Sequence, residues 1–177
     1  MKRLILILIF LFCKLSSCQS PIKNPKQQAV INSKPVEVPI ENGIAIAYFA
    51  SGCFWCVEAI YESVIGVHES VSGYAGGFTK NPTYELSNTG RTGHAEAVEV
   101  HYDPKLVSFS TLLDVYFGSQ NVGQVNGQGP DKGSQYRSIV FYQNETQKTL
   151  ILNKIFEIEK MQNTKVAAEV YPFQKFW

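Results

Sequence analysis

Hydrophobic and polar residues follow one another along this chain in segments that predict alternating strands and helices. Residues 44–50 form a short apolar run of β-branched and aromatic side chains, typical of a buried strand. Over residues 53–66 apolar side chains recur at helical spacing, up to a glycine placed where a C-terminal cap belongs. Further strands are predicted at 67–74, 93–102, 136–142 and 165–171, and further helices at 82–88 (a short helix or turn), 108–117 and 144–161.

The order of these elements indicates an α+β fold, a two-layer α/β sandwich. We expect a ferredoxin-like plait with a mixed sheet and with helices mainly on one face. In the strand predicted at 93–102, Glu96 lies on the same face as Val98 and Val100, because side chains alternate along a strand. Residues 118–134 contain five glycines and no hydrophobic period. A stretch of that length between two regular elements predicts an ordered loop that borders a functional site.

The composition suits one globular domain, expected over residues 41–177 and as a monomer. The chain has 177 residues, of which 45% are hydrophobic, and a formal net charge of +1. A chain of this length buries a sizeable core. A charge so close to zero gives no reason to expect nucleic acid as a partner.

The first residues predict export. Lys2 and Arg3 precede an unbroken apolar run over residues 4–12. That run is shorter than the about 20 residues that span a bilayer, so residues 1–17 are predicted to be a secretory signal peptide. The sequence Leu15-Ser16-Ser17-Cys18 resembles a bacterial lipobox, which predicts a lipid on Cys18. The alternative is an ordinary leader with an incidental cysteine.

A lipid on Cys18 would place the protein in the bacterial cell envelope, on the periplasmic side or the outer surface, with its membrane anchor at the N-terminus. The segment from Cys18 to residue 40 is polar, contains four prolines and shows no amphipathic period. We expect it to be a flexible linker between the lipid and the domain.

The segment after the first predicted strand holds the chemistry. Ser51 and Gly52 supply a turn, and Cys53 is expected in the first turn of the helix, where the helix dipole favours a thiolate. Cys56 follows three positions later. Three classes of function fit two cysteines at this place: a thioredoxin-like thiol oxidant, a carrier that binds a soft metal through both sulfurs, and a nucleophilic cysteine beside an aromatic substrate pocket. No histidine has the spacing of a metal site.

Four motifs favour the nucleophile. They are Gly52-Cys53-Phe54-Trp55, Gly73-Tyr74-Ala75-Gly76-Gly77, Gly93-His94-Ala95-Glu96-Ala97 and Gly133-Ser134-Gln135-Tyr136-Arg137-Ser138. With these motifs the chain, from about residue 47 to its end, resembles the type A peptide methionine sulfoxide reductases. The resemblance implies an oxidoreductase acting on sulfur groups, which reduces the S epimer of methionine sulfoxide, free or in proteins, and needs no metal or organic cofactor. A soft-metal carrier and an inactive relative remain the alternatives.

The resemblance also implies roles for the motif residues. Cys53 attacks the sulfoxide sulfur, and Glu96 is the general acid that protonates the oxygen, a role that suits a carboxyl with a raised pKa. Tyr74 and Tyr136 donate hydrogen bonds to the same oxygen. Attack leaves a sulfenic acid on Cys53. Cys56 is the candidate resolving cysteine, with direct attack by an external thiol as the alternative, and thioredoxin or a periplasmic thiol-disulfide relay protein completes the cycle.

Phe54 and Trp55 are expected to hold the S-methyl group of the substrate. Two departures from the family pattern stand out. Relatives carry an aspartate in the loop before the Gly-Ser-Gln-Tyr motif, and alignment places Asn121 there, an uncharged residue expected in the substrate site. Relatives also continue beyond the equivalent of Trp177 into a segment with a histidine–glutamine pair, so the C-terminal end appears short by this comparison.

Overall fold

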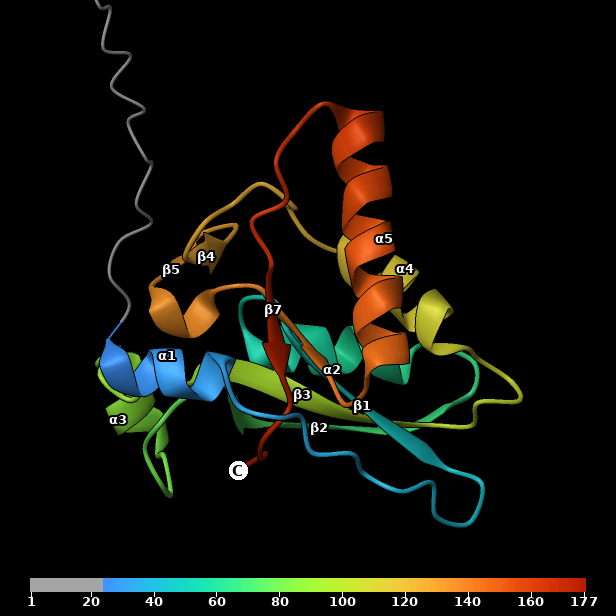
Figure 1. The fold of residues 1–177 in the computed structure, drawn as a ribbon, viewed down its shortest axis with the longest axis horizontal. Coiled ribbons are helices and arrows are strands. Elements are labelled where there is room, and N and C mark those ends of the chain that lie inside the picture. The colour runs from blue at the N-terminus through green and yellow to red at the C-terminus, as the bar shows by residue number, and fades with distance from the viewer. Residues whose placement is uncertain (1–23) are drawn as a thin grey trace, which may run out of the picture.

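A computed structural model describes residues 24–177, and the predicted signal peptide and the predicted lipidation site Cys18 lie outside the described residues. Its main sheet has five strands in the order β2-β3-β1-β6-β7 (Figure 1). The strands are β1 (Ala45–Ala50), β2 (Val67–Ala75), β3 (Ala95–Tyr102), β6 (Ile139–Tyr142) and β7 (Glu169–Pro172), and a separate small hairpin pairs β4 (Gly127–Gln128) with β5 (Asp131–Lys132). The helices are α1 (Pro25–Ile31), α2 (Phe54–Glu62), α3 (Tyr84–Asn88), α4 (Phe109–Gly118) and α5 (Glu145–Gln162), with a 3₁₀ turn, η1, at Ser134–Tyr136.

The strand pairing confirms the predicted ferredoxin-like plait. β1 lies between β3 and β6 and is antiparallel to both, and β2 is antiparallel to β3. β7 adds a fifth strand parallel to β6, which makes the sheet mixed. β3 is therefore an interior strand of the sheet, and this places its side chains away from either edge.

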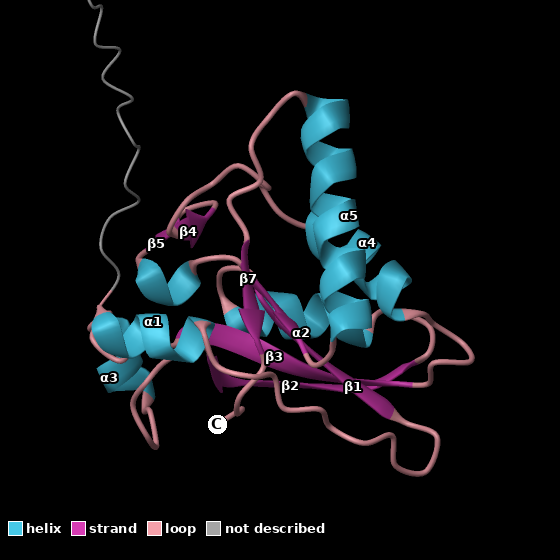
Figure 2. Ribbon diagram, viewed as in Figure 1, coloured by secondary structure: helices cyan, strands magenta, loops and turns pink. Residues whose placement is uncertain are grey.

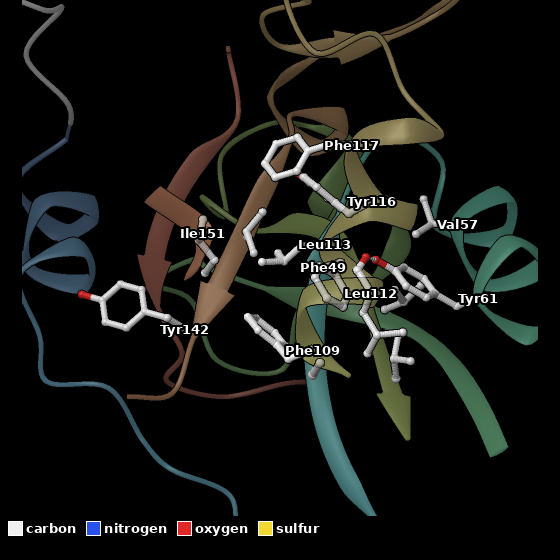
Figure 3. Packing of buried hydrophobic residues seen from close by; sticks show 14 of the residues in the cluster. Phe49, Val57, Tyr61, Phe109, Leu112, Leu113, Tyr116, Phe117, Tyr142 and Ile151 are labelled. Carbon is white, nitrogen blue, oxygen red and sulfur yellow. Dashed lines mark hydrogen bonds between the residues drawn. The ribbon is translucent and has the colours of Figure 1, made fainter. Parts of the chain in front are cut away.

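The main core lies between one face of the sheet and three helices, α2, α4 and α5 (Figures 2 and 3). Phe49 on β1 contributes the central ring, stacked against Tyr61 of α2 at 4.9 Å between ring centroids. The Tyr61 hydroxyl donates to the carbonyl of Leu112 on α4, so burial of the phenol leaves no unpaired polar atom. The helices thus sit mainly on one face, as the apolar periods predict.

Side-chain caps set where two helices of this layer, α4 and α5, begin. Ser108 Oγ accepts from the N–H of Thr111 at the start of α4, at 3.0 Å. Asn144 Oδ1 accepts from the N–H of Gln147 at the start of α5, also at 3.0 Å. Each cap satisfies a backbone donor that has no partner within its helix. Among residues 24–177 no helix is both long and apolar enough to cross a bilayer.

The N-terminal segment corrects one prediction. Residues 18–40 were predicted to form a flexible linker, and for residues 24–40 this is wrong. Ile31 and Val38 pack on the second face of the sheet, against a cluster that contains the stacked rings of Tyr48 and Phe173. Ile31 and Val38 contact this cluster separately and follow no helical period. The sequence pattern therefore does not reveal their burial. The folded unit therefore begins before residue 41.

The glycine-rich loop, residues 118–134, is ordered, as predicted, but the strand after it begins later than expected. Tyr136 was predicted to open a strand at 136–142, and it lies instead in the 3₁₀ turn η1, with β6 starting at Ile139. Gly133 precedes this turn with φ 140°, a backbone angle that favours glycine. The turn points Tyr136 toward the end of β3 rather than along the sheet, which brings it to the candidate site.

Candidate active site

The turn that carries Cys53 is held from both sides. Tyr116 on α4 donates its hydroxyl to the carbonyl of Ala50, the last residue of β1, at 2.9 Å. Gly52 has φ +83°, and a Cβ at this position would lie 2.7 Å from Cβ of Gln128. The positive φ and the close approach to Gln128 both require glycine at position 52. The close approach fixes the residue before Cys53 against the glycine-rich loop.

Cys53 is the N-cap residue of α2, one position before the first turn in which it was expected. Its carbonyl accepts from the N–H groups of Cys56 and Val57 at 3.1 and 3.2 Å, so the helix begins directly after it. The side chain makes no capping hydrogen bond. The sulfur is partly exposed, at the end of the helix where backbone N–H groups favour negative charge.

Glu96 is the buried acid of the site. It is 2% exposed and lies on the interior strand β3, directly opposite Tyr74 of β2. Its Oε2 accepts from the backbone N–H of Phe54 at 3.1 Å. Burial raises the pKa of Glu96 above its ordinary value, the hydrogen bond from Phe54 opposes the rise, and the negative charge of Asp131 adds to it. A carboxyl in these surroundings keeps its proton to higher pH than an exposed one.

Two phenols share the space around this carboxyl. Burial raises the pKa of Tyr74 to about 12, with further contributions from Glu96 and Tyr84. Burial also raises the pKa of Tyr136, and the charge of Glu96 adds to the rise. Both hydroxyls therefore stay protonated at neutral pH and are available as hydrogen-bond donors. The structure brings together Glu96, Tyr74 and Tyr136 from three separate motifs.

Aromatic rings form a wall beside Cys53. The Phe54 ring lies 5.4 Å from that of Trp55 and 5.7 Å from that of Tyr74. Tyr84 of α3 completes the wall, with its ring 6.5 Å from Phe54 and 6.4 Å from Trp55. Trp55 is 63% exposed, so the wall faces solvent and is open to a ligand.

Tyr84 is a site residue to which the sequence analysis assigned no role. Its signal was the sequence Asn81-Pro82-Thr83-Tyr84, in which Thr83 caps α3 by accepting from the N–H of Leu86. A cap at Thr83 starts the helix at Tyr84 and so orients this ring. The separation of 29 residues between Trp55 and Tyr84 in the sequence hid their contact.

A cavity of about 550 Å³ is lined by both Cys53 and Cys56. Its lining residues come from α2 and from the glycine-rich loop: Ser51, Cys53, Cys56, Val57, Ile60, Gly118, Ser119, Gln120, Asn121, Gln124, Gln128, Gly129, Pro130 and Asp131. The charge of Cys53 raises the pKa of Cys56, and burial, a hydrogen bond with Cys53 and the charge of Asp131 act in the same direction. Cys56 therefore keeps its proton to a higher pH than an isolated thiol. Within residues 24–177 no three or more His, Cys, Asp or Glu side chains are grouped as a metal site would need.

Asn121 was expected in the substrate site, and the structure shows a carboxylate nearby, that of Asp131, to which no role was assigned from the sequence. Asn121 lines the cavity, and its Oδ1 accepts from the N–H of Gly123 at 3.1 Å, so the side chain holds a loop turn. The carboxylate that acts on Glu96, Tyr136 and Cys56 is Asp131, whose charge raises the pKa of all three. The missed signal was an aspartate two residues before Gly133. The carboxylate of Asp131 thus gives the site a negative charge, although Asn121 is uncharged.

Arg137 links the segment before β3, the strand that carries Glu96, to the turn η1, which carries Tyr136. It is 7% exposed and donates from Nη2 to the carbonyl of Gly93 at 2.8 Å and from Nη1 to that of Ser134 at 2.6 Å. Gly93 lies just before β3 and Ser134 opens η1. The guanidinium therefore sets the spacing between Glu96 and Tyr136 without reaching the cysteine.

Comparison with known proteins gives consistent matches. The model of a family described as peptide methionine sulfoxide reductase matches residues 45–177, a range that holds every site residue above. The peptide methionine sulfoxide reductase MsrA of Pasteurella multocida is 47% identical over 131 residues, which cover 74% of this chain and 75% of that protein.

Solved structures show the same fold. The crystal structure of Mxr1 from Saccharomyces cerevisiae in reduced form matches with a TM-score of 0.72 at 28% identity. The match covers 83% of this chain and 84% of the Mxr1 chain. Mxr1 in complex with Trx2 matches with a TM-score of 0.56 at 20% identity, over 79% of this chain and 84% of its own, which shows the fold alone.

Proposed function

This chain belongs to the peptide methionine sulfoxide reductase family, and we propose that Cys53, Glu96, Tyr74 and Tyr136 carry out its reaction. The enzyme reduces methionine sulfoxide to methionine and acts on the S epimer, since each epimer has its own enzyme. Family membership decides in favour of an enzyme over a soft-metal carrier. The observation that carries the assignment of residues is the hydrogen bond from Phe54 to the buried Glu96, because it ties the acid to the residue next to the nucleophile.

In the first step the Cys53 thiolate attacks the sulfur of the sulfoxide. Oxygen is a poor leaving atom unless it is protonated, and the proton comes from Glu96, whose pKa is raised by burial. Tyr74 and Tyr136 donate hydrogen bonds to the same oxygen as its charge develops. Sulfur loses the oxygen and leaves as methionine, while the oxygen stays on Cys53 as a sulfenic acid. Two electrons pass from Cys53 to the substrate.

Phe54, Trp55 and Tyr84 are proposed to hold the S-methyl group of the substrate. Their rings lie between 5.4 and 6.5 Å from one another and form an apolar surface beside Cys53. Seating the methyl group there points the sulfoxide oxygen of one epimer toward Glu96 and that of the other epimer away. One methyl group in an apolar site contributes about 1–3 kcal/mol of discrimination. Oxidised methionines in proteins and free methionine sulfoxide both present this group.

Cys56 is proposed to resolve the sulfenic acid. Its thiol hydrogen-bonds with Cys53 and stays protonated beside it. The Cys56 sulfur displaces hydroxide from Cys53, which leaves as water with the thiol proton, and a disulfide forms. A dithiol reductant then restores both thiols. We expect thioredoxin or a periplasmic thiol-disulfide relay protein in this role. The complex of Mxr1 with Trx2 is a precedent for such a partner in a protein of this fold.

Export and lipid anchoring are also proposed, on the sequence of residues 1–18 alone. The basic, apolar and Leu-Ser-Ser-Cys segments support a lipoprotein signal with Cys18 as the modified residue. Incorporation of labelled fatty acid into the native protein and its loss in Cys18→Ser would test this. Equal labelling of both proteins would refute it.

Turnover of the separated S and R epimers of methionine sulfoxide with dithiothreitol tests the catalytic assignment. Turnover of S alone, abolished by Cys53→Ser in a protein with unchanged circular dichroism, is the expected result. Turnover that survives Cys53→Ser would overturn the assignment of the nucleophile. Cys56→Ser is the companion variant: one equivalent of methionine forms from reduced enzyme, and no disulfide follows.

A further inference from the structure

We propose that His94 is a positioning residue for the reduction of methionine sulfoxide. Its ring ties the loop of residues 76–83, which we call the β2–α3 loop, to the start of β3, and thereby holds Tyr84 in the aromatic wall beside Cys53. This role rests on the proposed function, because it presupposes that the wall seats the S-methyl group of the substrate. His94 stands two residues before Glu96, and the mechanism above leaves it without a part.

Both ring nitrogens of His94 have backbone partners in the β2–α3 loop. The residue is 2% exposed. Nδ1 accepts from the N–H of Gly77 at 3.2 Å, and Nε2 lies 2.9 Å from the carbonyl oxygen of Thr79. A carbonyl oxygen can only accept, so Nε2 carries the proton, and Nδ1, which accepts, carries none. The two bonds therefore form together only with a neutral ring in this one tautomer.

The surroundings of His94 favour the neutral ring. Burial lowers the pKa of His94 and the positive charge of Arg137 lowers it further, while hydrogen bonding to the carbonyls of Thr79 and Ala75 opposes the fall. Arg137 is held next to this residue, since its Nη1 donates to the carbonyl of His94 at 3.4 Å. A second proton, on Nδ1, would face the N–H of Gly77 and break the contact.

Gly77 fits the loop to the ring. A Cβ on Gly77 would lie 2.4 Å from Cγ, from Cδ2 and from the backbone nitrogen of His94, so the loop backbone touches the imidazole with no room for a side chain. Gly77 is not among the glycines with positive φ. Close approach rather than backbone angle therefore requires glycine at this position. The contact between ring and loop is thus built into both segments.

The β2–α3 loop leads directly to the ring of Tyr84. Thr79, which His94 holds through Nε2, lies four residues before Thr83, the cap of α3. α3 has only five residues, and so short a helix is marginal by itself, so its place depends on the chain that leads into it. Tyr84 is 45% exposed, which leaves its outer side to solvent. The bond to Thr79 therefore helps to keep this ring in the wall.

The groups that carry out the chemistry are held by other contacts. Tyr74 exchanges two backbone hydrogen bonds with Trp177, both at 3.1 Å, and is paired with Glu96 in the sheet. The Glu96 carboxyl accepts from the N–H of Phe54. Loss of the His94 bonds should therefore loosen the wall and leave the acid and the first tyrosine in place. Weaker seating of the substrate, with the reacting groups unmoved, raises KM and spares kcat.

Two variants separate the two bonds of the ring. Glutamine at position 94 brings an amide nitrogen near the place of Nε2 and retains a donor for Thr79, whereas asparagine brings an amide oxygen near the place of Nδ1 and retains an acceptor for Gly77. With dithiothreitol as reductant, His94→Asn is expected to raise KM for methionine sulfoxide about tenfold and to keep kcat within about threefold. His94→Gln should restore KM to within about threefold of the native value.

Three results would overturn the positioning role. They are a native KM in His94→Asn, a loss confined to kcat, and an equal rise of KM in both variants, because a general loss of packing does not distinguish the two bonds. Thermal unfolding of the two variants, each of which lacks one bond, should give similar melting temperatures and so separates positioning from misfolding. A native enzyme that forms no methionine from the sulfoxide would instead contradict the proposed function.

A double-mutant cycle shows whether His94 acts through Tyr84. If it does, His94→Asn changes KM by less than about twofold in a protein that already carries Tyr84→Ala, because the ring that it positions is gone. Effects that multiply would mean that the two residues act independently, and would overturn the proposal.

The native protein provides a test that needs no variant. In a spectrum of protein labelled with ¹⁵N-histidine, the ring that shows nuclear Overhauser contacts to Gly77 should carry a slowly exchanging proton on Nε2 and none on Nδ1. A proton on Nδ1, or a ring proton in rapid exchange with water, would show that the ring does not hold the loop.

Discussion

The backbone N–H of Phe54 donates to Oε2 of Glu96 over 3.1 Å, and this contact joins the first residue of α2 to the interior strand β3. A backbone donor at a helix start has no partner within the helix, so the carboxyl satisfies it. The same carboxyl is 2% exposed, and burial raises its pKa. One hydrogen bond thus fixes the Glu96 carboxyl beside Cys53, while burial raises the pH at which this carboxyl loses its proton.

Glu96→Gln should lower kcat by about 10²–10⁴-fold, since a general acid contributes that much and glutamine has no acidic proton. Native activity should fall as the pH rises through the raised pKa of Glu96, and the variant should lose that alkaline limb. The measurement is a pH profile of kcat for both proteins. A variant with the native profile would contradict the assignment of the acid.

The stability of these two proteins should diverge with pH. The folded pKa of Glu96 is raised, so the native state binds more protons than the unfolded state above the unfolded pKa of about 4.3. Native stability therefore decreases as the pH rises from there through the folded pKa, and glutamine is free of this loss. The melting temperature of Glu96→Gln relative to the native protein should rise over that window.

Asp131→Asn should shift the titration of three groups to lower pH. The charge of Asp131 raises the pKa of Cys56, Glu96 and Tyr136, so its removal lowers each. Alkylation of Cys56 by iodoacetamide should reach its midpoint at lower pH, and the alkaline limb of activity should move the same way. Lys132→Ala, at the neighbouring exposed position, is the control and should leave both midpoints in place.

Tyr84→Ala should raise KM for methionine sulfoxide by about tenfold, which corresponds to the loss of part of an apolar site. The ring lies against both Phe54 and Trp55, and its removal opens the wall that we propose to hold the methyl group. Tyr84→Phe retains the ring and should retain KM. Steady-state kinetics of both variants make the comparison, and an equal rise of KM in the two would point to the hydroxyl instead.

Gln27→Ala should lower the free energy of unfolding by about 0.5–1.5 kcal/mol, because it removes a hydrogen bond to the half-buried Gly76. Gln27 is 8% exposed, and its Nε2 donates to the carbonyl of Gly76 at 2.6 Å. Gln28→Ala, on the exposed side of the same helix, is the control and should change stability little. Denaturant unfolding measures both. Equal stability of the two variants would mean that α1 does not support the loop after β2.

The strand, turn and helix around Cys53 followed from local pattern alone. The apolar run at 44–50, the glycine at 52 and the helical spacing after Cys53 lie within some twenty residues, and such short-range periods depend on the backbone itself. The face of Glu96 followed from the period of two in a strand. Its burial did not, because alternation alone is the same for an interior strand and an edge strand.

Contacts between distant segments were decided by the tertiary structure. Tyr84 contacts Trp55, the charge of Asp131 raises the pKa of Glu96, and Gln27 donates a hydrogen bond to Gly76. The partners in these pairs are 29, 35 and 49 residues apart in the sequence. No local period encodes such a meeting, since the pairing of strands and the closing of loops are chosen by the burial of the whole core. The sequence by itself predicted the five main strands, the helices from α2 to α5 and the plait. Only the tertiary structure decided that the charge of Asp131, the ring of Tyr84 and the side chain of Gln27 lie where they do.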